Sequence, residues 1–79
     1  MRLLIGNLDP SLIESDLQRL FTPYGEIHSV EIQRDKWNNR SQGRAFIEMP
    51  VPEQALAAVA RLNGYSFASR SLTVSVAPV

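Results

Sequence analysis

Several short stretches of the chain have the apolar pattern of β-strands, which alternate with a period of two or form brief apolar runs. Residues 3–5 form such a run, too short for a helix, and Gly6-Asn7 stops it. Residues 27–34, 44–49 and 71–76 alternate between apolar and polar positions. The pattern predicts four strands, with the Asn7 side chain organising the turn after the first one by hydrogen bonds to backbone.

Two longer stretches repeat apolar residues at helical spacing. The first has acidic residues in its first turn, where the helix dipole favours them, and Pro23 and Gly25 predict its end near Phe21. The second begins at Pro52, a residue that suits the first helical position, and runs up to Asn63-Gly64. The apolar residues of these predicted helices are Leu12, Leu17, Leu20 and Phe21 in the first and Ala55, Leu56, Val59, Ala60 and Leu62 in the second.

The order of the predicted elements is βαββαβ. Residues 35–42 have no apolar period and contain two successive Asn residues, so they are predicted to be a loop between the second and third strands. Right-handed crossovers put both helices on the same side of the sheet. We therefore predict a single α+β domain over residues 1–79, a ferredoxin-like sandwich whose four-stranded antiparallel sheet has two helices on one face. The other face is left open, and the functional residues are expected there.

The composition excludes several classes of function. A chain of 79 residues has room for one core and no second catalytic lobe. With no Cys and one His, His28, it cannot form a disulfide framework or a zinc site, and we expect no metal and no cofactor. A formal net charge of zero argues against strong non-specific DNA binding. Because no apolar stretch is long enough for a signal or a membrane span, we expect a soluble cytoplasmic protein.

Two motifs resemble those of the RNA-recognition-motif (RRM) family. Residues 3–8, LLIGNL, are similar to the family's strand 1 hexamer, and residues 42–49, QGRAFIEM, to its strand 3 octamer, K/R-G-F/Y-G/A-F-V-x-F/Y. Supporting matches are Leu17, Phe21, Tyr24-Gly25, Ala55 and Leu62-Asn63-Gly64. The resemblance implies the same βαββαβ fold and the binding of single-stranded RNA on the exposed sheet face. A start immediately before the first strand is similar to small stand-alone bacterial members, and an excised domain of a longer protein is the alternative.

The phase of the third predicted strand selects the residues that would face RNA. Ala45 and Ile47 are in phase with the core, so Arg44 and Phe46 project onto the open face, and Leu4 joins them from the first strand. The family typically has aromatic residues at these three positions, but only Phe46 is aromatic here. Each stack of a base on an aromatic ring contributes about 1–3 kcal/mol, so this degenerate platform predicts micromolar or weaker binding.

Further RNA contacts are predicted beside this platform. Lys36, Trp37 and Arg40 would hold the RNA strand from the loop, and the last strand would add backbone contacts at Ser75 and Ala77. Although the formal net charge is zero, the charges are predicted to be separated, with acidic residues near the first helix and basic residues around the loop. These basic residues are Arg34, Lys36, Arg40 and Arg44.

Some residues oppose RNA binding or have a purely structural alternative. Gln42 replaces the usual phosphate-binding Lys or Arg, and Glu31 and Glu48 on the open face should repel phosphate. The structural alternative for Arg44 is an ion pair with one of these two carboxylates. The structural alternative for Trp37 is that its side chain folds back over the loop or the sheet edge and packs there as a lid.

A protein-binding variant of the family is the alternative function. Such a domain would bind a peptide or protein through its helical side, and the acidic first helix favours this. The Arg-x-Phe motif typical of such variants is replaced here by Tyr65-Ser66-Phe67. Catalysis is not expected, because no candidate nucleophile lies beside a base and no carboxylates cluster. We therefore expect a monomeric binding module rather than an enzyme.

Overall fold

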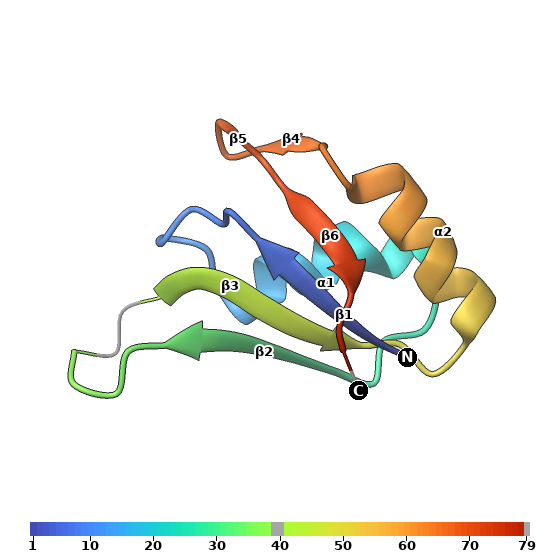
Figure 1. Ribbon diagram of the computed structural model, residues 1–79, viewed down its shortest axis with the longest axis horizontal. Helices are drawn as coiled ribbons and strands as arrows, with labels where there is room; N and C mark the ends of the chain where they lie inside the picture. The colour runs from blue at the N-terminus through green and yellow to red at the C-terminus, as the bar shows by residue number, and fades with distance from the viewer. Residues whose placement is uncertain (39–40, 79) are drawn as a thin grey trace.

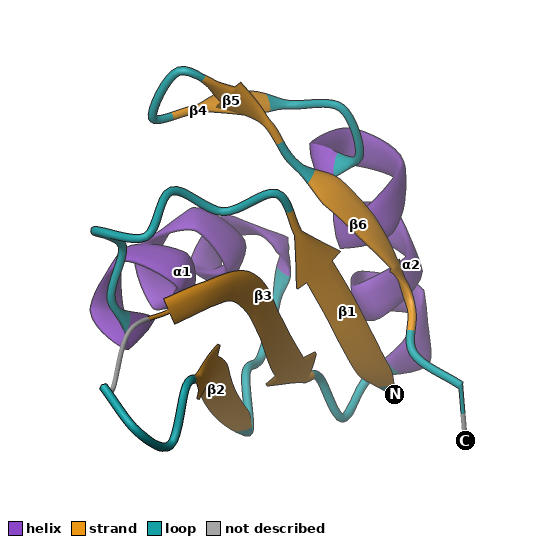
Figure 2. Ribbon diagram, turned by 60° about the vertical axis from the view of Figure 1, so that its left-hand side comes forward, coloured by secondary structure: helices purple, strands orange, loops and turns teal. Residues whose placement is uncertain are grey.

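The computed structural model, which describes residues 1–38 and 41–78 with the backbone alone at Ser41 and Gln42, confirms the predicted order of elements (Figure 1). Four strands pair antiparallel in the order β2-β3-β1-β6. The elements are β1 (Arg2–Gly6), α1 (Glu14–Phe21), the 3₁₀ turn η1 (Thr22–Tyr24), β2 (Ser29–Arg34), β3 (Ser41–Glu48), α2 (Pro52–Leu62) and β6 (Thr73–Val76). Both helices cover the same face of the sheet (Figure 2), which confirms the predicted α+β sandwich.

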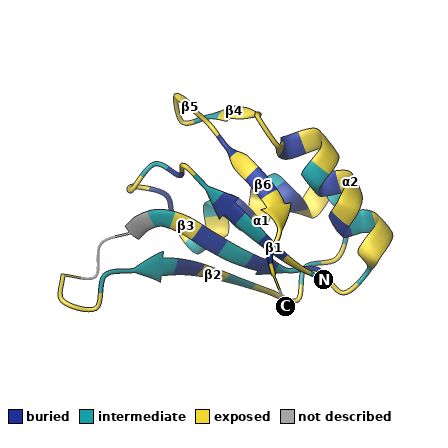
Figure 3. Ribbon diagram, in the orientation of Figure 1, coloured by how far each residue is buried: buried dark blue, intermediate teal, exposed yellow. Residues whose placement is uncertain are grey.

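The core lies between the sheet and the two helices. Leu3 pairs with Ile47 and Ile5 with Ala45, and all four side chains are buried among the helices. Figure 3 shows the resulting alternation of buried and less buried positions along β1 and β3. The helices contribute buried side chains from Leu17, Phe21, Ala55, Ala58 and Leu62. Because strand side chains alternate between faces, Leu4 of β1 and Arg44, Phe46 and Glu48 of β3 point to the open face, as predicted.

The buried side of α2 differs from the prediction. Leu56 is 51% exposed and Ala60 is also exposed, whereas Ala58 is fully buried. Successive helical residues are separated by about 100°, so Ala58 lies on the same arc as Ala55 and Leu62, and Leu56 falls outside it. The prediction was wrong at these positions because it selected residues by apolarity rather than by angular position.

A short hairpin that no predicted strand covers begins at Ser66 and precedes the last strand of the sheet. β4 (Ser66–Phe67) pairs with β5 (Arg70–Ser71), and the two residues between them, Ala68 and Ser69, both have positive φ angles, of 51° and 65°. Such a pair is usually Asn-Gly, so the sequence lacks the normal signal for this turn. β6 consequently begins at Thr73, later than predicted.

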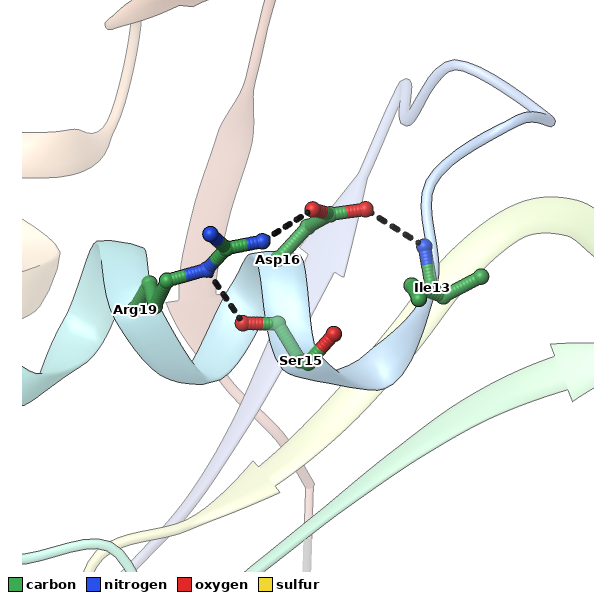
Figure 4. A network of polar contacts seen from close by, with 4 residues as sticks. All are labelled: Ile13, Ser15, Asp16 and Arg19. Carbon is green, nitrogen blue, oxygen red and sulfur yellow. Dashed lines mark hydrogen bonds and ion pairs between the residues drawn. The ribbon is translucent and has the colours of Figure 1, made fainter.

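One of the acidic side chains in the first turn of α1, Asp16, also caps the start of the helix. The backbone N–H of Ile13 donates to Asp16 Oδ2 at 2.9 Å, which satisfies one of the free amides at the helix start (Figure 4). Arg19 donates to Asp16 Oδ1 at 3.0 Å and to the Ser15 carbonyl at 3.4 Å. The Asp16 charge is therefore balanced within its own helix.

Hydrogen bonds to backbone groups also hold the turn after β1 in place. Asn7 has a φ of 59°, and its Nδ2 donates to the Ser71 carbonyl at 2.9 Å, so its side chain bonds to backbone as predicted but ties the turn to β5 rather than bonding within the turn itself. Gly43 accepts a hydrogen bond from the Leu8 amide at 2.9 Å. β3 is longer than predicted, because it begins inside the segment that the sequence assigned to the loop.

Candidate functional site

The open face of the sheet is organised in rows that the strand register aligns. The central row crosses all four strands in the order Glu31, Phe46, Leu4, Ser75. Phe46 and Leu4 are half-buried, and the two outer residues are exposed. The structure thus places Phe46 and Leu4 side by side at the centre of the open face, as the strand phases predicted. The next row on one side runs from Ser29 through Glu48 to Arg2.

Arg2 is a residue of this face that the sequence reasoning missed. Its guanidinium carbon lies 4.1 Å from the centre of the Phe46 ring, in a cation–π contact. One Nη atom lies 4.0 Å from Glu31 Oε2. The signal was present in the sequence, because Arg2 precedes Leu4 by two positions in the same strand and therefore faces the same side.

Arg44 is exposed on the open face, on the same side of β3 as Phe46. The alternative that it pairs with Glu31 or Glu48 is wrong, because no ion pair among the described residues includes it. Glu31 instead lies near Arg2, and Glu48 lies 3.9 Å from the N-terminal ammonium group. The guanidinium of Arg44 therefore remains a cation without a carboxylate partner within the part of the chain that the structure describes.

Trp37 lies in the loop after β2. Its side chain is 86% exposed, so the alternative that it folds back as a packing lid is wrong. The Asp35 carboxylate shapes this loop by accepting the Trp37 amide at 2.8 Å and the Asn38 amide at 3.3 Å. Lys36 Nζ lies 5.3 Å from the Trp37 ring. Arg40, the third loop residue that the sequence predicted, lies outside the described residues.

Arg34 does not add to the positive charge of the loop, in contrast to the predicted polarity. Its two terminal nitrogens donate to both carboxylate oxygens of Glu14, at 2.7 and 3.1 Å, and so tie β2 to α1. The hydrogen bond from Arg34 holds the pKa of Glu14 below its ordinary value, and the same bond raises the pKa of Arg34. Since Asp16 is paired with Arg19, the acidic charges of α1 that favoured a protein partner are largely balanced.

Ser75 and Ala77, the two residues predicted to contact RNA through their backbone at the edge strand β6, differ in their exposure. Ser75 is exposed in the central row of the open face. Ala77, just after β6, has only 6% of its surface exposed, and its N–H donates to the Arg2 carbonyl at 2.8 Å. Ser75 is therefore the more accessible of the two positions.

One pocket of about 600 Å³ lies away from this central row, where the start of β1, the end of β6 and the start of α2 meet. It is lined by Met1, Arg2, Pro52, Val76, Ala77 and Pro78. The lining is mostly apolar, and Val76 is 45% exposed although it alternates in phase with the buried Val74 along β6.

Other kinds of site find no support in the described part of the chain. No three acidic or His side chains within residues 1–38 and 41–78 gather closely enough to hold a metal ion. No helix among these residues is long and apolar enough to cross a membrane. Asp9 has a pKa below its ordinary value because the Ser11 hydroxyl and amide donate to its Oδ1, a local turn contact rather than a ligand site. The open face and its loop are therefore the best-supported site.

Comparison with known proteins identifies the family to which this arrangement corresponds. The family model described as RNA recognition motif matches residues 3–73. Polyadenylate-binding protein 2 of Arabidopsis thaliana is 36% identical over 75 residues, which cover 95% of this chain and 12% of that protein. The chain thus spans a small part of this relative. Among solved structures, RNA-binding protein PG1 has a TM-score of 0.95 at 34% identity, covering 98% of this chain and 93% of that one. The Sxl-lethal protein–RNA complex has a TM-score of 0.94 at 28% identity, covering 99% and 47%.

Proposed function

Because the chain belongs to the RNA recognition motif family, we propose that it is a non-catalytic module that binds single-stranded RNA on the open face of its sheet. The observation that carries this proposal is the position of Phe46, a half-buried aromatic ring at the centre of the open face. A flat ring fixed on a rigid strand offers a surface on which an unpaired base stacks. The protein–RNA complex among the similar structures supports RNA as the ligand.

The affinity proposed for this surface is weak to moderate. Phe46 is the only aromatic residue of the central row, and Leu4 beside it offers apolar contact without a π-face. Each missing stack removes about 1–3 kcal/mol of binding free energy. Arg44 partly compensates, because an exposed guanidinium stacks on a base or pairs with a phosphate.

The loop after β2 supplies a second contact in this proposal. Trp37 has its ring almost fully exposed, with Lys36 beside it, so a base and its phosphate meet an aromatic face and a cation together. Arg40 is proposed to add a phosphate contact from the same loop, and Ser75 and Ala77 to bind the RNA at the opposite edge of the sheet. The RNA strand would then cross the sheet from the loop to β6.

The proposal is tested by titrating the protein with a pool of short single-stranded RNAs of mixed sequence, with amide chemical shifts and fluorescence as readouts. Chemical shifts report on Leu4, Arg44 and Phe46, and the fluorescence of the single Trp reports on the loop. Phe46→Ala should weaken binding by about 5- to 150-fold, the value of one stack. Tyr65→Ala is the matched control, because Tyr65 is an aromatic residue with 47% exposure outside the four-stranded sheet.

Two results would contradict the proposal. If RNA perturbs no residue of the open face at saturating concentration, the sheet is not the binding surface. If Phe46→Ala and Tyr65→Ala weaken binding equally, the ring is not a stacking platform. Spectra of the buried residues of β1 and β3 in each variant verify that the fold is unchanged.

A further inference from the structure

The ring proposed as the base platform is already covered on one face in the free protein. Arg2 lies diagonally across from Phe46, and its guanidinium carbon is 4.1 Å from the ring centre. This is the separation at which a flat group stacks, and it is close to the separation at which a nucleobase would stack. Arg2 and a base therefore compete for the same face of Phe46.

Arg2 is held only loosely in this position. Its side chain is 51% exposed, and the nearest carboxylate, Glu31, is 70% exposed and lies at 4.0 Å, the outer limit of an ion pair. An exposed cation–π contact changes an equilibrium constant by about two- to fivefold, and an exposed ion pair by a similar factor or less. A stacked base contributes about 5- to 150-fold, so the base prevails in this exchange.

The charges around Phe46 indicate which group the guanidinium of Arg2 would pair with once a base displaces it from the ring. Glu31 lies opposite the ring in the register, and Glu48 lies opposite Arg2, so two carboxylates face the path of the phosphates. Arg2 is the cation closest to Phe46 among the described residues, and only Arg44 is a second arginine on this face. A phosphate that approaches a base on Phe46 is therefore best neutralised by Arg2.

We propose that Arg2 is an RNA-binding residue that exchanges partners, covering Phe46 in the free protein and pairing with an RNA phosphate once a base has taken the ring. This inference rests on the proposed function and adds a residue and a mechanism to it. The exchange keeps the aromatic ring shielded from water until RNA arrives. It also keeps a positive charge beside Glu31, the carboxylate that would otherwise repel the phosphate.

The first experiment measures the salt dependence of RNA affinity for the wild type, Arg2→Gln, Arg2→Lys and Arg61→Gln. Arg61, in the last turn of α2, is exposed on the helical side and serves as the matched control for loss of one positive charge. If Arg2 binds a phosphate, the slope of log K against log salt falls by about 0.7 in Arg2→Gln, because one fewer counterion is released from single-stranded RNA. Arg2→Lys should keep the slope, and Arg61→Gln should leave it unchanged.

The second experiment follows the Nε–H proton of Arg2 by NMR. In the free wild type the aromatic ring should shift this signal upfield, and Phe46→Ala provides the unstacked reference. Saturation of the wild type with RNA should move the signal towards that reference value. A signal that stays upfield in the complex would mean that Arg2 remains on the ring, and it would overturn the exchange.

The outcomes separate this inference from the proposed function. If the wild type binds no RNA, or if Phe46→Ala leaves affinity unchanged, both fail. If binding depends on Phe46 but Arg2→Gln keeps the wild-type salt slope, the role of Arg2 alone is overturned. Spectra of the buried core residues establish that each variant is folded.

Discussion

The ion pair between Glu14 and Arg34 should be the strongest of the surface ion pairs described here. The guanidinium donates from two nitrogens to both carboxylate oxygens, at 2.7 and 3.1 Å, across 20 residues of sequence. The side chains of Arg34 and Glu14 are 27% and 44% exposed, so solvent screens the pair only in part. Exposed pairs contribute about 0.2–1 kcal/mol, and the bidentate geometry places this one near 1 kcal/mol.

A double-mutant cycle with Glu14→Gln and Arg34→Met isolates this energy from the other effects of each substitution. Urea unfolding at neutral pH should give a coupling free energy of about 1 kcal/mol, and the loss corresponds to about 4–8 °C in the melting temperature of a domain this small. Asp16 and Arg19 provide the control pair. They lie three residues apart within α1, and Arg19 is 77% exposed, so their coupling should be about 0.3–0.5 kcal/mol.

The pH dependence of the cycle follows from the lowered pKa of Glu14. The ordinary pKa of a glutamate side chain is 4.5, and the hydrogen bond from Arg34 lowers the pKa of Glu14 in the folded state. A carboxyl group of this kind binds protons more readily in the unfolded chain, so its stabilising effect is complete above pH 4.5 and is lost as the pH falls through the folded-state pKa. A coupling no larger than that of the control pair, or one that persists unchanged in strong acid, would refute the reasoning.

Two further predictions concern the turn between β4 and β5 and the exposed side of α2. Replacing Ala68 by Asn and Ser69 by Gly should stabilise the protein by about 1 kcal/mol, because both positions have positive φ and this residue pair favours such a turn. Thermal unfolding measures the gain, and an unchanged or lower melting temperature would contradict it. Leu56→Gln should change stability by less than about 0.5 kcal/mol because Leu56 is 51% exposed, whereas Ala58→Gln should cost about 2 kcal/mol or more by burying an amide and overpacking the core. Equal urea midpoints for the two variants would show that the burial of α2 is wrongly assigned.

The pattern along the chain was sufficient for the order of the strands in the sequence and for the faces of the central residues of β1 and β3. Phe46 and Leu4 lie on the open face because strand side chains alternate, and this period is a local property of the backbone. The end of α1 at Phe21 and the start of α2 at Pro52 were also predictable, because proline and glycine restrict the backbone at those positions. The β4–β5 hairpin was missed because Ala68 and Ser69 are unusual residues for the turn that they form.

The sequence by itself therefore determined the order of elements, the buried face of each strand and the single aromatic residue at the centre of the open face. Only the tertiary structure decided the partners of the long charged side chains. Arg34 turns to Glu14 rather than to the loop, and Arg2 covers Phe46 rather than extending into solvent. Each alternative differs by about 1 kcal/mol, and the choice depends on which groups the register and the helix packing bring within reach. Residues far apart in sequence become neighbours only when the sheet is assembled, so no local pattern contains that information.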